Sequence, residues 1–152
     1  IMKKQREELL INLNQKATLQ TIKGFKKLID RRSSREPIAY ILREKEFWSK
    51  IFLVDKNTLI PRPETELMVE KITGIFKNKN IQILDIGTGT GCILISILSE
   101  LKQSKGVGID ISQKAIRIAI KNSIKHKLID QAKFYKRSFK NWKKFGKNDY
   151  SR

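Results

Sequence analysis

The segment that most constrains the fold is Asp85-Ile86-Gly87-Thr88-Gly89-Thr90-Gly91. A strand predicted over 81–86 ends inside it, and a helix predicted over 92–101 begins directly after it. Three glycines in the turn let backbone N–H groups approach a ligand, because no Cβ stands in the way. A strand, a glycine-rich turn and a helix in this order predict a nucleotide-type cofactor site in an α/β fold.

The chain continues with alternating strands and helices. A second strand is expected over 107–111, a helix begins after Ser112 as its N-cap, and a third strand is expected over 132–136. Alternation of this kind predicts a parallel sheet with right-handed crossovers. The fold class is therefore α/β, a Rossmann-like sheet of which this chain supplies the first three strands.

The N-terminal part has a different pattern. Helices are expected over 4–14 and from Thr18 to about residue 33, and a hairpin is expected from strands over 38–42 and 47–54, with polar residues 43–46 between them. Pro63 fits the first position of a helix that extends to about Phe76. We therefore expect a helical segment over 1–36, a hairpin linker over 37–62 and a cofactor-binding domain over 63–152.

The glycine pattern narrows the cofactor. A dinucleotide fingerprint would need glycine at the sixth position counted from Gly87, where Cys92 stands, and a Gly-Lys-Ser/Thr phosphate loop is absent. What is present is a D-x-G-x-G-x-G turn, from Asp85 to Gly91. Asp110 lies 25 positions after Asp85, at the end of the next predicted strand. An acid there can accept hydrogen bonds from both hydroxyls of a ribose.

Asp85 to Gly91 resembles the first motif of class I S-adenosylmethionine methyltransferases. Three further segments resemble the release-factor glutamine methyltransferases, the HemK-like family: Arg35-Glu36-Pro37-Ile38-Ala39-Tyr40-Ile41-Leu42, Lys45-Glu46-Phe47-Trp48-Ser49 and Leu59-Ile60-Pro61-Arg62-Pro63-Glu64-Thr65-Glu66. The resemblance implies N5-methylation of the glutamine in the Gly-Gly-Gln loop of peptide-chain release factors. It also implies a small helical N-terminal domain that helps dock the release factor.

The resemblance also implies which residues hold S-adenosylmethionine. The cofactor would be wrapped by Gly87, Thr88, Gly89, Thr90 and Gly91, and Asp110 would hold its ribose. Phe139 falls near the adenine side, and Trp142 takes that place if the register differs. The border of the pocket would be formed by Asp85, and at the methionine end by Arg62, Pro63 and Thr65, where helix N–H groups can meet a carboxylate.

This chain departs from the family pattern at several positions. Arg35 and Arg43 stand where the family has glycine, so positive φ angles there would strain the backbone. The family's acceptor motif, Asn-Pro-Pro-Tyr, orients the glutamine, but the prolines of this chain are Pro37, Pro61 and Pro63. We therefore assign no catalytic residue, and we expect a chain truncated at its C-terminus and also at its N-terminus that is inactive alone.

Composition adds weaker constraints. The net charge is +18, from 33 basic and 15 acidic residues. This surplus is attributed mainly to compositional bias, with proximity to a ribosome or nucleic acid as the functional alternative. Cys92, the only cysteine, is expected to be a core residue, and His126, the only histidine, a surface residue, so no metal site is expected. No apolar run is long enough to span a membrane, and a cytoplasmic protein is expected.

Alternative functions share the cofactor turn. One alternative is a methyltransferase that modifies a ribosomal-protein glutamine, and another is an N6-adenine nucleic-acid methyltransferase. The segment from Pro61 to Glu66 favours a glutamine acceptor, whereas the basic charge slightly favours nucleic acid. A third alternative, of a different class, is a non-catalytic remnant of a decaying gene.

Overall fold

The computed structural model describes residues 10–11 and 16–140. The chain divides into two compact units, Ile1–Ile41 and Leu42–Arg152, which are described separately below. The helix predicted over 4–14 falls mostly outside the described residues. In the described ranges, no helix is long and apolar enough to cross a membrane.

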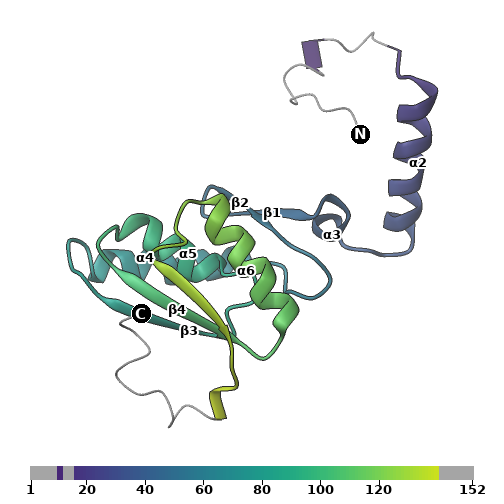
Figure 1. Cartoon of the computed structure of the whole chain (residues 1–152). Helices are drawn as coiled ribbons and strands as arrows, with labels where there is room; N and C mark the ends of the chain where they lie inside the picture. The colour runs from purple at the N-terminus through teal and green to yellow at the C-terminus, as the bar shows by residue number, and fades with distance from the viewer. Residues whose placement is uncertain (1–9, 12–15, 141–152) are drawn as a thin grey trace. The chain divides into compact units, whose positions relative to one another are not determined.

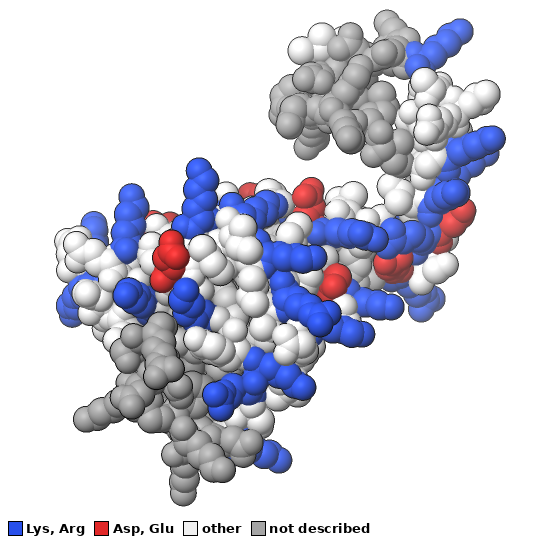
Figure 2. Space-filling view, in the orientation of Figure 1, with Lys and Arg blue, Asp and Glu red and all other residues white. Residues whose placement is uncertain are grey.

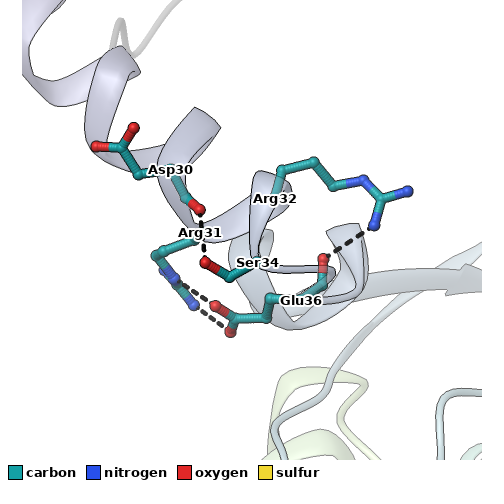
Figure 3. A network of polar contacts seen from close by, with 5 residues as sticks. All are labelled: Asp30, Arg31, Arg32, Ser34 and Glu36. Atoms are coloured by element: carbon teal, nitrogen blue, oxygen red, sulfur yellow. Dashed lines mark hydrogen bonds and ion pairs between the residues drawn. The ribbon is translucent and has the colours of Figure 1, made fainter.

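The first unit is built around helix α2 (Leu19–Ser33). Thr18 is its N-cap, as predicted, and the Thr18 hydroxyl accepts a hydrogen bond of 3.2 Å from the backbone N–H of Thr21. Beyond the helix, Arg31 donates two hydrogen bonds, of 2.7 and 2.5 Å, to the carboxylate of Glu36 (Figure 3). This bidentate pair fixes the turn after α2, but solvent screening keeps its contribution to stability small.

Residues 38–42 form the short helix α3 (Ile38–Leu42), so the strand predicted there is wrong. The backbone N–H groups of Tyr40 and Ile41 both donate to the carbonyl of Pro37, at 3.0 and 3.1 Å. Proline begins a helical turn readily because its φ is already helical and its missing N–H is not needed there. The β-branched residues that favoured a strand carry only a weak preference, which this local turn overrides.

The second unit begins with an antiparallel hairpin of β1 (Glu44–Phe47) and β2 (Lys50–Leu53). The hairpin was predicted, but its turn lies at Trp48-Ser49 rather than at residues 43–46. Both turn residues have positive φ, 52° and 51°, as a two-residue turn that matches strand twist requires. Phe47 and Phe52 are buried and meet edge to face, with ring centroids 6.1 Å apart, so the hairpin joins the core.

The remaining elements follow the predicted alternation. They are the 3-10 turn η1 (Pro63–Thr65), α4 (Glu66–Ile75), β3 (Gln82–Ile86), α5 (Cys92–Glu100), β4 (Lys105–Asp110), α6 (Gln113–Lys125) and β5 (Ala132–Lys136) (Figure 1). The strands form a parallel sheet in the order β3-β4-β5. Helices α5 and α6 pack on β4 and on each other, which places both crossover helices on one face of the sheet. The predicted α/β class with a three-stranded parallel sheet is confirmed.

The core explains the sequence of α5, which is apolar around most of its circumference. Leu94, Ile95, Ile97 and Leu98 are each at most 1% exposed, because the helix lies between the sheet, α4 and α6. Val69 of α4 is fully buried in the same cluster. A helix buried on several sides holds the glycine turn at its N-terminus rigidly against the sheet.

Basic side chains are spread over the visible face of the molecule (Figure 2). Lys and Arg appear along many elements of that face rather than on one helix or loop. The positive charge on this face is thus not confined to one element.

The two arginines that replace family glycines do adopt left-handed backbone conformations. The φ angle is 64° at Arg35 and 62° at Arg43. The strained conformation at Arg43 is held in place because its carbonyl accepts a hydrogen bond of 3.1 Å from Val54 N–H, which closes the open end of the hairpin. The strain expected from the sequence is therefore present at both positions.

Replacing Arg43 with glycine is expected to raise the free energy of unfolding by about 0.5–1 kcal/mol. Glycine removes the clash of Cβ at positive φ, and the larger freedom of the unfolded chain offsets part of that gain. Urea unfolding followed by circular dichroism measures the change. The control is Lys121→Gly, at an exposed position inside α6, which is expected to lose about 1 kcal/mol. A loss of stability in Arg43→Gly would contradict the assignment of strain.

Candidate functional site

The candidate site lies where β3 and β4 end. The two strands are parallel, and Asp85 of β3 lies opposite Gly108 of β4, so their carboxyl ends meet at one edge of the sheet. Asp85 and Asp110 both lie at this edge, and the glycine turn leaves β3 there. Ligands of open α/β sheets bind outside the carboxyl ends of the strands, which makes this edge the expected position for a cofactor.

The turn is fixed onto the neighbouring strand by its own backbone. The N–H groups of Gly87 and Thr88 both donate to the carbonyl of Ile109 in β4, at 2.8 and 2.9 Å. The N–H of Gly91 then donates to the carbonyl of Thr88 at 2.8 Å, which closes the turn. These bonds hold the loop in one conformation before any ligand arrives, and such preorganisation lowers the cost of binding.

The glycines of the turn have two different roles. All three have positive φ, 75° at Gly87, 54° at Gly89 and 78° at Gly91. A Cβ at Gly87 would meet nothing within 4 Å, and at Gly89 only a backbone oxygen at 3.9 Å, so this part of the turn faces open space. A Cβ at Gly91 would meet Ile95 at 3.1 Å and Ala119 at 3.2 Å. Gly87 and Gly89 therefore leave room for a ligand, whereas Gly91 lets α5 pack closely.

Two backbone amides orient the carboxylate of Asp110. Oδ2 accepts a hydrogen bond of 3.1 Å from Gly89 N–H, and Oδ1 accepts one of 2.8 Å from Ser112 N–H. Each carboxylate oxygen has further lone pairs, so both can still accept a hydroxyl proton. The structure thus presents a fixed acceptor with two oxygens, as recognition of a vicinal diol requires.

Asp85 lies in a half-buried position beside the turn. Its Oδ2 accepts a hydrogen bond of 2.7 Å from the hydroxyl of Thr88. Burial raises the pKa of Asp85 above its usual range, the Thr88 hydroxyl and the Leu94 backbone lower it, and the charge of Asp110 raises it further. Two neighbouring carboxylates disfavour a phosphate at this edge and favour a neutral or cationic group.

The other predicted site residues are placed less tightly. Arg62, Pro63 and Thr65 lie at the start of α4, where Thr65 N–H donates to the carbonyl of Arg62 at 3.0 Å. Phe139 is 55% exposed, and it follows β5 on the edge of the sheet where Asp110 ends β4. Trp142 lies outside the described residues. Participation of these residues in the site stays a prediction.

Two residues near the site were missed from the sequence. Ile111 directly follows Asp110 and is 73% exposed, which is unusual for a large apolar side chain at the end of a buried strand. Asn122 is fully buried in α6, where its amide bonds to β2 and to the glycine turn. The sequence signal for Asn122 was its helical spacing from the buried Ile116 and Ala119, which puts a polar residue on the apolar face of the helix.

Cys92 and His126 have structural surroundings. Cys92 is buried, as predicted, and burial raises the pKa of its thiol to about 11. His126 is half-buried rather than on the surface, because its ring lies 4.7 Å from that of Phe52. Within the described part of the chain, no group of three or more His, Cys, Asp and Glu residues could hold a metal ion.

Glu66, the first residue of α4, contacts the turn of the hairpin. Its Oε1 accepts a hydrogen bond of 2.9 Å from the backbone N–H of Trp48. The indole N–H of Trp48 donates to Glu100 of α5 at 3.0 Å. The turn of the hairpin is therefore fixed to the two helices α4 and α5.

Replacing Asp85 with asparagine should alter how stability depends on pH. Because the pKa of Asp85 is raised, the folded state binds this proton more tightly than the unfolded chain does. The free energy of unfolding of the wild type therefore falls as pH rises from the usual Asp range through the raised pKa. The stability of Asp85→Asn relative to the wild type is therefore expected to increase between pH 4 and pH 7. Urea midpoints across this range test the sign, and a flat or falling difference would contradict it.

Cys92 is expected to resist alkylation in the folded protein. A pKa of about 11 instead of 9.0 lowers the thiolate fraction at pH 8 about 100-fold, and burial blocks access further. Labelling by iodoacetamide, followed by mass spectrometry, should be more than about 100-fold slower in buffer than in guanidinium chloride. Equal rates under both conditions would show that the thiol is accessible and that α5 is not packed as described.

Comparison with known proteins gives two family matches. Residues 77–150 match the model of a methyltransferase domain, and residues 1–42 match that of the PrmC N-terminal domain. The delta-N METTL16 MTase domain, a solved structure, aligns with a TM-score of 0.50 at 22% identity, covering 59% of this chain and 42% of that one. At this identity the structural likeness supports the fold alone.

Relatives extend the similarity across both parts of the chain. A release factor glutamine methyltransferase of Buchnera aphidicola subsp. Schizaphis graminum is 40% identical over 140 residues, covering 91% of this chain and 50% of that protein. Its counterpart from Buchnera aphidicola subsp. Baizongia pistaciae is 43% identical over 124 residues, covering 81% and 45%. A bifunctional methyltransferase of Rickettsia prowazekii is 40% identical over 144 residues, covering 82% and 28%.

The chain thus spans half or less of the length of these relatives. The two family models nevertheless match in succession along the chain, the PrmC N-terminal domain first and the methyltransferase domain second. With the glycine turn and Asp110 placed together at the edge of the sheet, these findings agree on one assignment. The chain is similar to the HemK-like class I methyltransferases in both of its parts.

Proposed function

We propose that this chain binds S-adenosylmethionine at the glycine turn, as part of an enzyme that methylates the glutamine of the Gly-Gly-Gln motif in peptide-chain release factors. The observation that carries the proposal is the carboxylate of Asp110, which Gly89 and Ser112 hold with both oxygens able to accept further hydrogen bonds. The similarity to release factor glutamine methyltransferases supports the acceptor.

The residues at the edge of the sheet fit this cofactor. Gly87 and Gly89 leave open space beside the turn, and Asp110 can accept both ribose hydroxyls. The adenine would lie between apolar side chains of Ile111 and Phe139, both of which are exposed. The N–H of Arg137 donates to the carbonyl of Asp110 at 2.9 Å, which directs the segment carrying Phe139 toward this edge.

The negative charge of the edge fits the cofactor as well. The cofactor supplies an electrophilic methyl group on a positively charged sulfur. Asp85 and Asp110 favour a cation nearby, and the buried helix α5 excludes water from one side of the turn. We assign the methionine end to the segment that contains Arg62, Pro63 and Thr65, with Trp142 as the alternative to Phe139 for the adenine.

The acceptor side is proposed from the family. Residues 1–36 would help dock the release factor, residues 37–62 would link them to the cofactor-binding domain, and residues 63–152 would carry the cofactor. This acceptor belongs to translation, so we infer that the chain acts in the cytoplasm. An amide is a poor nucleophile that needs precise orientation, and no Asn-Pro-Pro-Tyr occurs in the 152 residues. We therefore expect this chain alone to bind the cofactor without transferring the methyl group.

Replacing Asp110 with asparagine tests the cofactor site. Loss of a charged acceptor should raise the Kd for S-adenosylhomocysteine about 10- to 100-fold, since such hydrogen bonds contribute about 1.5–3 kcal/mol. Isothermal titration calorimetry measures the affinity. Asp130→Asn removes the same charge at an exposed position and should change the Kd less than about twofold. Unchanged binding by Asp110→Asn would contradict the assignment of the ribose site.

The expected inactivity of this chain alone is tested by methyl transfer from tritiated S-adenosylmethionine. Release factor, ribosomal protein and DNA are offered separately to this chain. We expect binding of the cofactor and no labelling of any acceptor. Labelling at the Gly-Gly-Gln glutamine would support the substrate but refute the need for the missing motif, whereas labelling of DNA alone would overturn the proposed acceptor.

A further inference from the structure

Asn122 makes hydrogen bonds that neither the fold nor the proposed cofactor contacts explain. Its side chain is fully buried in α6, yet the hydrogen bonds of its amide go to other elements. Oδ1 accepts a hydrogen bond of 2.7 Å from Leu53 N–H. Nδ2 donates to the carbonyl of Leu53 at 3.0 Å and to the carbonyl of Thr90 at 2.9 Å. One amide thus joins strand β2 of the hairpin to the glycine turn.

The bond to Thr90 controls a specific peptide plane. The carbonyl of Thr90 and the N–H of Gly91 belong to the same planar peptide unit. The N–H end is held by the carbonyl of Thr88 at 2.8 Å, and the carbonyl end is held by Asn122. With both ends fixed, this unit cannot rotate. Without Asn122, one end would be free and the positive φ of Gly91 would be less well defined.

The bonds to Leu53 give the hairpin the same anchor. Asn122 matches the donor and the acceptor of one residue in β2, in the way that a neighbouring strand would. Phe52, next to Leu53, is fully buried. The turn of the hairpin is held separately, by Glu66 and Glu100 through Trp48. Asn122 is therefore the anchor that connects the hairpin with the glycine turn.

We propose that Asn122 is a positioning residue that couples the hairpin to the cofactor turn, so that binding of the cofactor rigidifies the hairpin and a correctly placed hairpin strengthens cofactor binding. This inference rests on the proposed cofactor site. Coupling is reciprocal, because the effect of the cofactor on the hairpin must equal the effect of the hairpin on cofactor affinity. The chain would thereby assemble its cofactor site and the segment leading to Pro63 as one body.

The first test is affinity. Asn122→Ala removes the bridge, and Ser123→Ala is the matched control, because Ser123 is also fully buried in α6 but its hydroxyl bonds only to Ile120 of the same helix, at 2.8 Å. At a temperature where both variants are folded, Asn122→Ala should raise the Kd for S-adenosylhomocysteine about tenfold, and Ser123→Ala less than twofold. A Kd for Asn122→Ala within twofold of the control would overturn the proposal, since a purely structural residue would lower only the melting temperature.

The second test is hydrogen exchange at individual amides. S-adenosylhomocysteine should slow exchange of Leu53 N–H in the wild type and in Ser123→Ala, but not in Asn122→Ala. Unchanged exchange at Leu53 in the ligand-bound wild type would refute the coupling.

A measurement without ligand separates this inference from the proposed function. In the free protein, Asn122→Ala should speed exchange at Leu53 and at Gly91 together, because the bridge holds both. If the wild type fails to bind S-adenosylhomocysteine, the proposed function fails, while faster exchange at both amides would still support the bridge. Faster exchange at Leu53 alone would overturn it.

Discussion

The parallel pairing of β3 with β4 is the constraint on which the rest of this structure depends. It brings Asp85 and Asp110 to one edge, and it places the carbonyl of Ile109 where the N–H groups of Gly87 and Thr88 can reach it. These two bonds attach the start of the turn to the sheet through backbone atoms. Glycine adopts the positive φ angles of this path without strain, and it leaves open space at Gly87 and Gly89.

The hairpin is held in place by contacts with the core and with the neighbouring helices. Its strands are short, and a two-stranded hairpin alone is barely stable in water. Phe47 and Phe52 of the hairpin are buried in the core. Trp48 forms hydrogen bonds with α4 and α5, and Leu53 forms hydrogen bonds with Asn122 of α6. These contacts outweigh the strain at Arg43, Trp48 and Ser49, all of which have positive φ. The hairpin is thus a fixed part of the second unit.

The sequence was sufficient for the α/β core because its signals were local. The apolar runs, the Ser112 cap and the glycine turn each specify an element without reference to the rest of the chain, and the structure confirms them. Residues 38–42 were wrongly predicted as a strand because the bonds to the carbonyl of Pro37 outweigh the propensity of β-branched residues. The position of the hairpin turn depended on pairing, which local propensity does not specify.

The site was predicted less completely than the fold, for a similar reason. Asp110 could be identified because it ends a predicted strand, but the amides that orient it come from Gly89 and Ser112, on either side of β4 in the chain. Asn122 could not be assigned a role, because its partners are 69 and 32 residues away. Such contacts exist only once the hairpin, the turn and α6 are packed together.

A crystal structure of this chain with S-adenosylhomocysteine would test the central claim most directly. The account predicts the ribose hydroxyls within hydrogen-bond distance of both carboxylate oxygens of Asp110, with the ligand lying against Gly87 and Gly89. A ligand bound at another surface, or an Asp110 side chain turned away from the ribose, would contradict it.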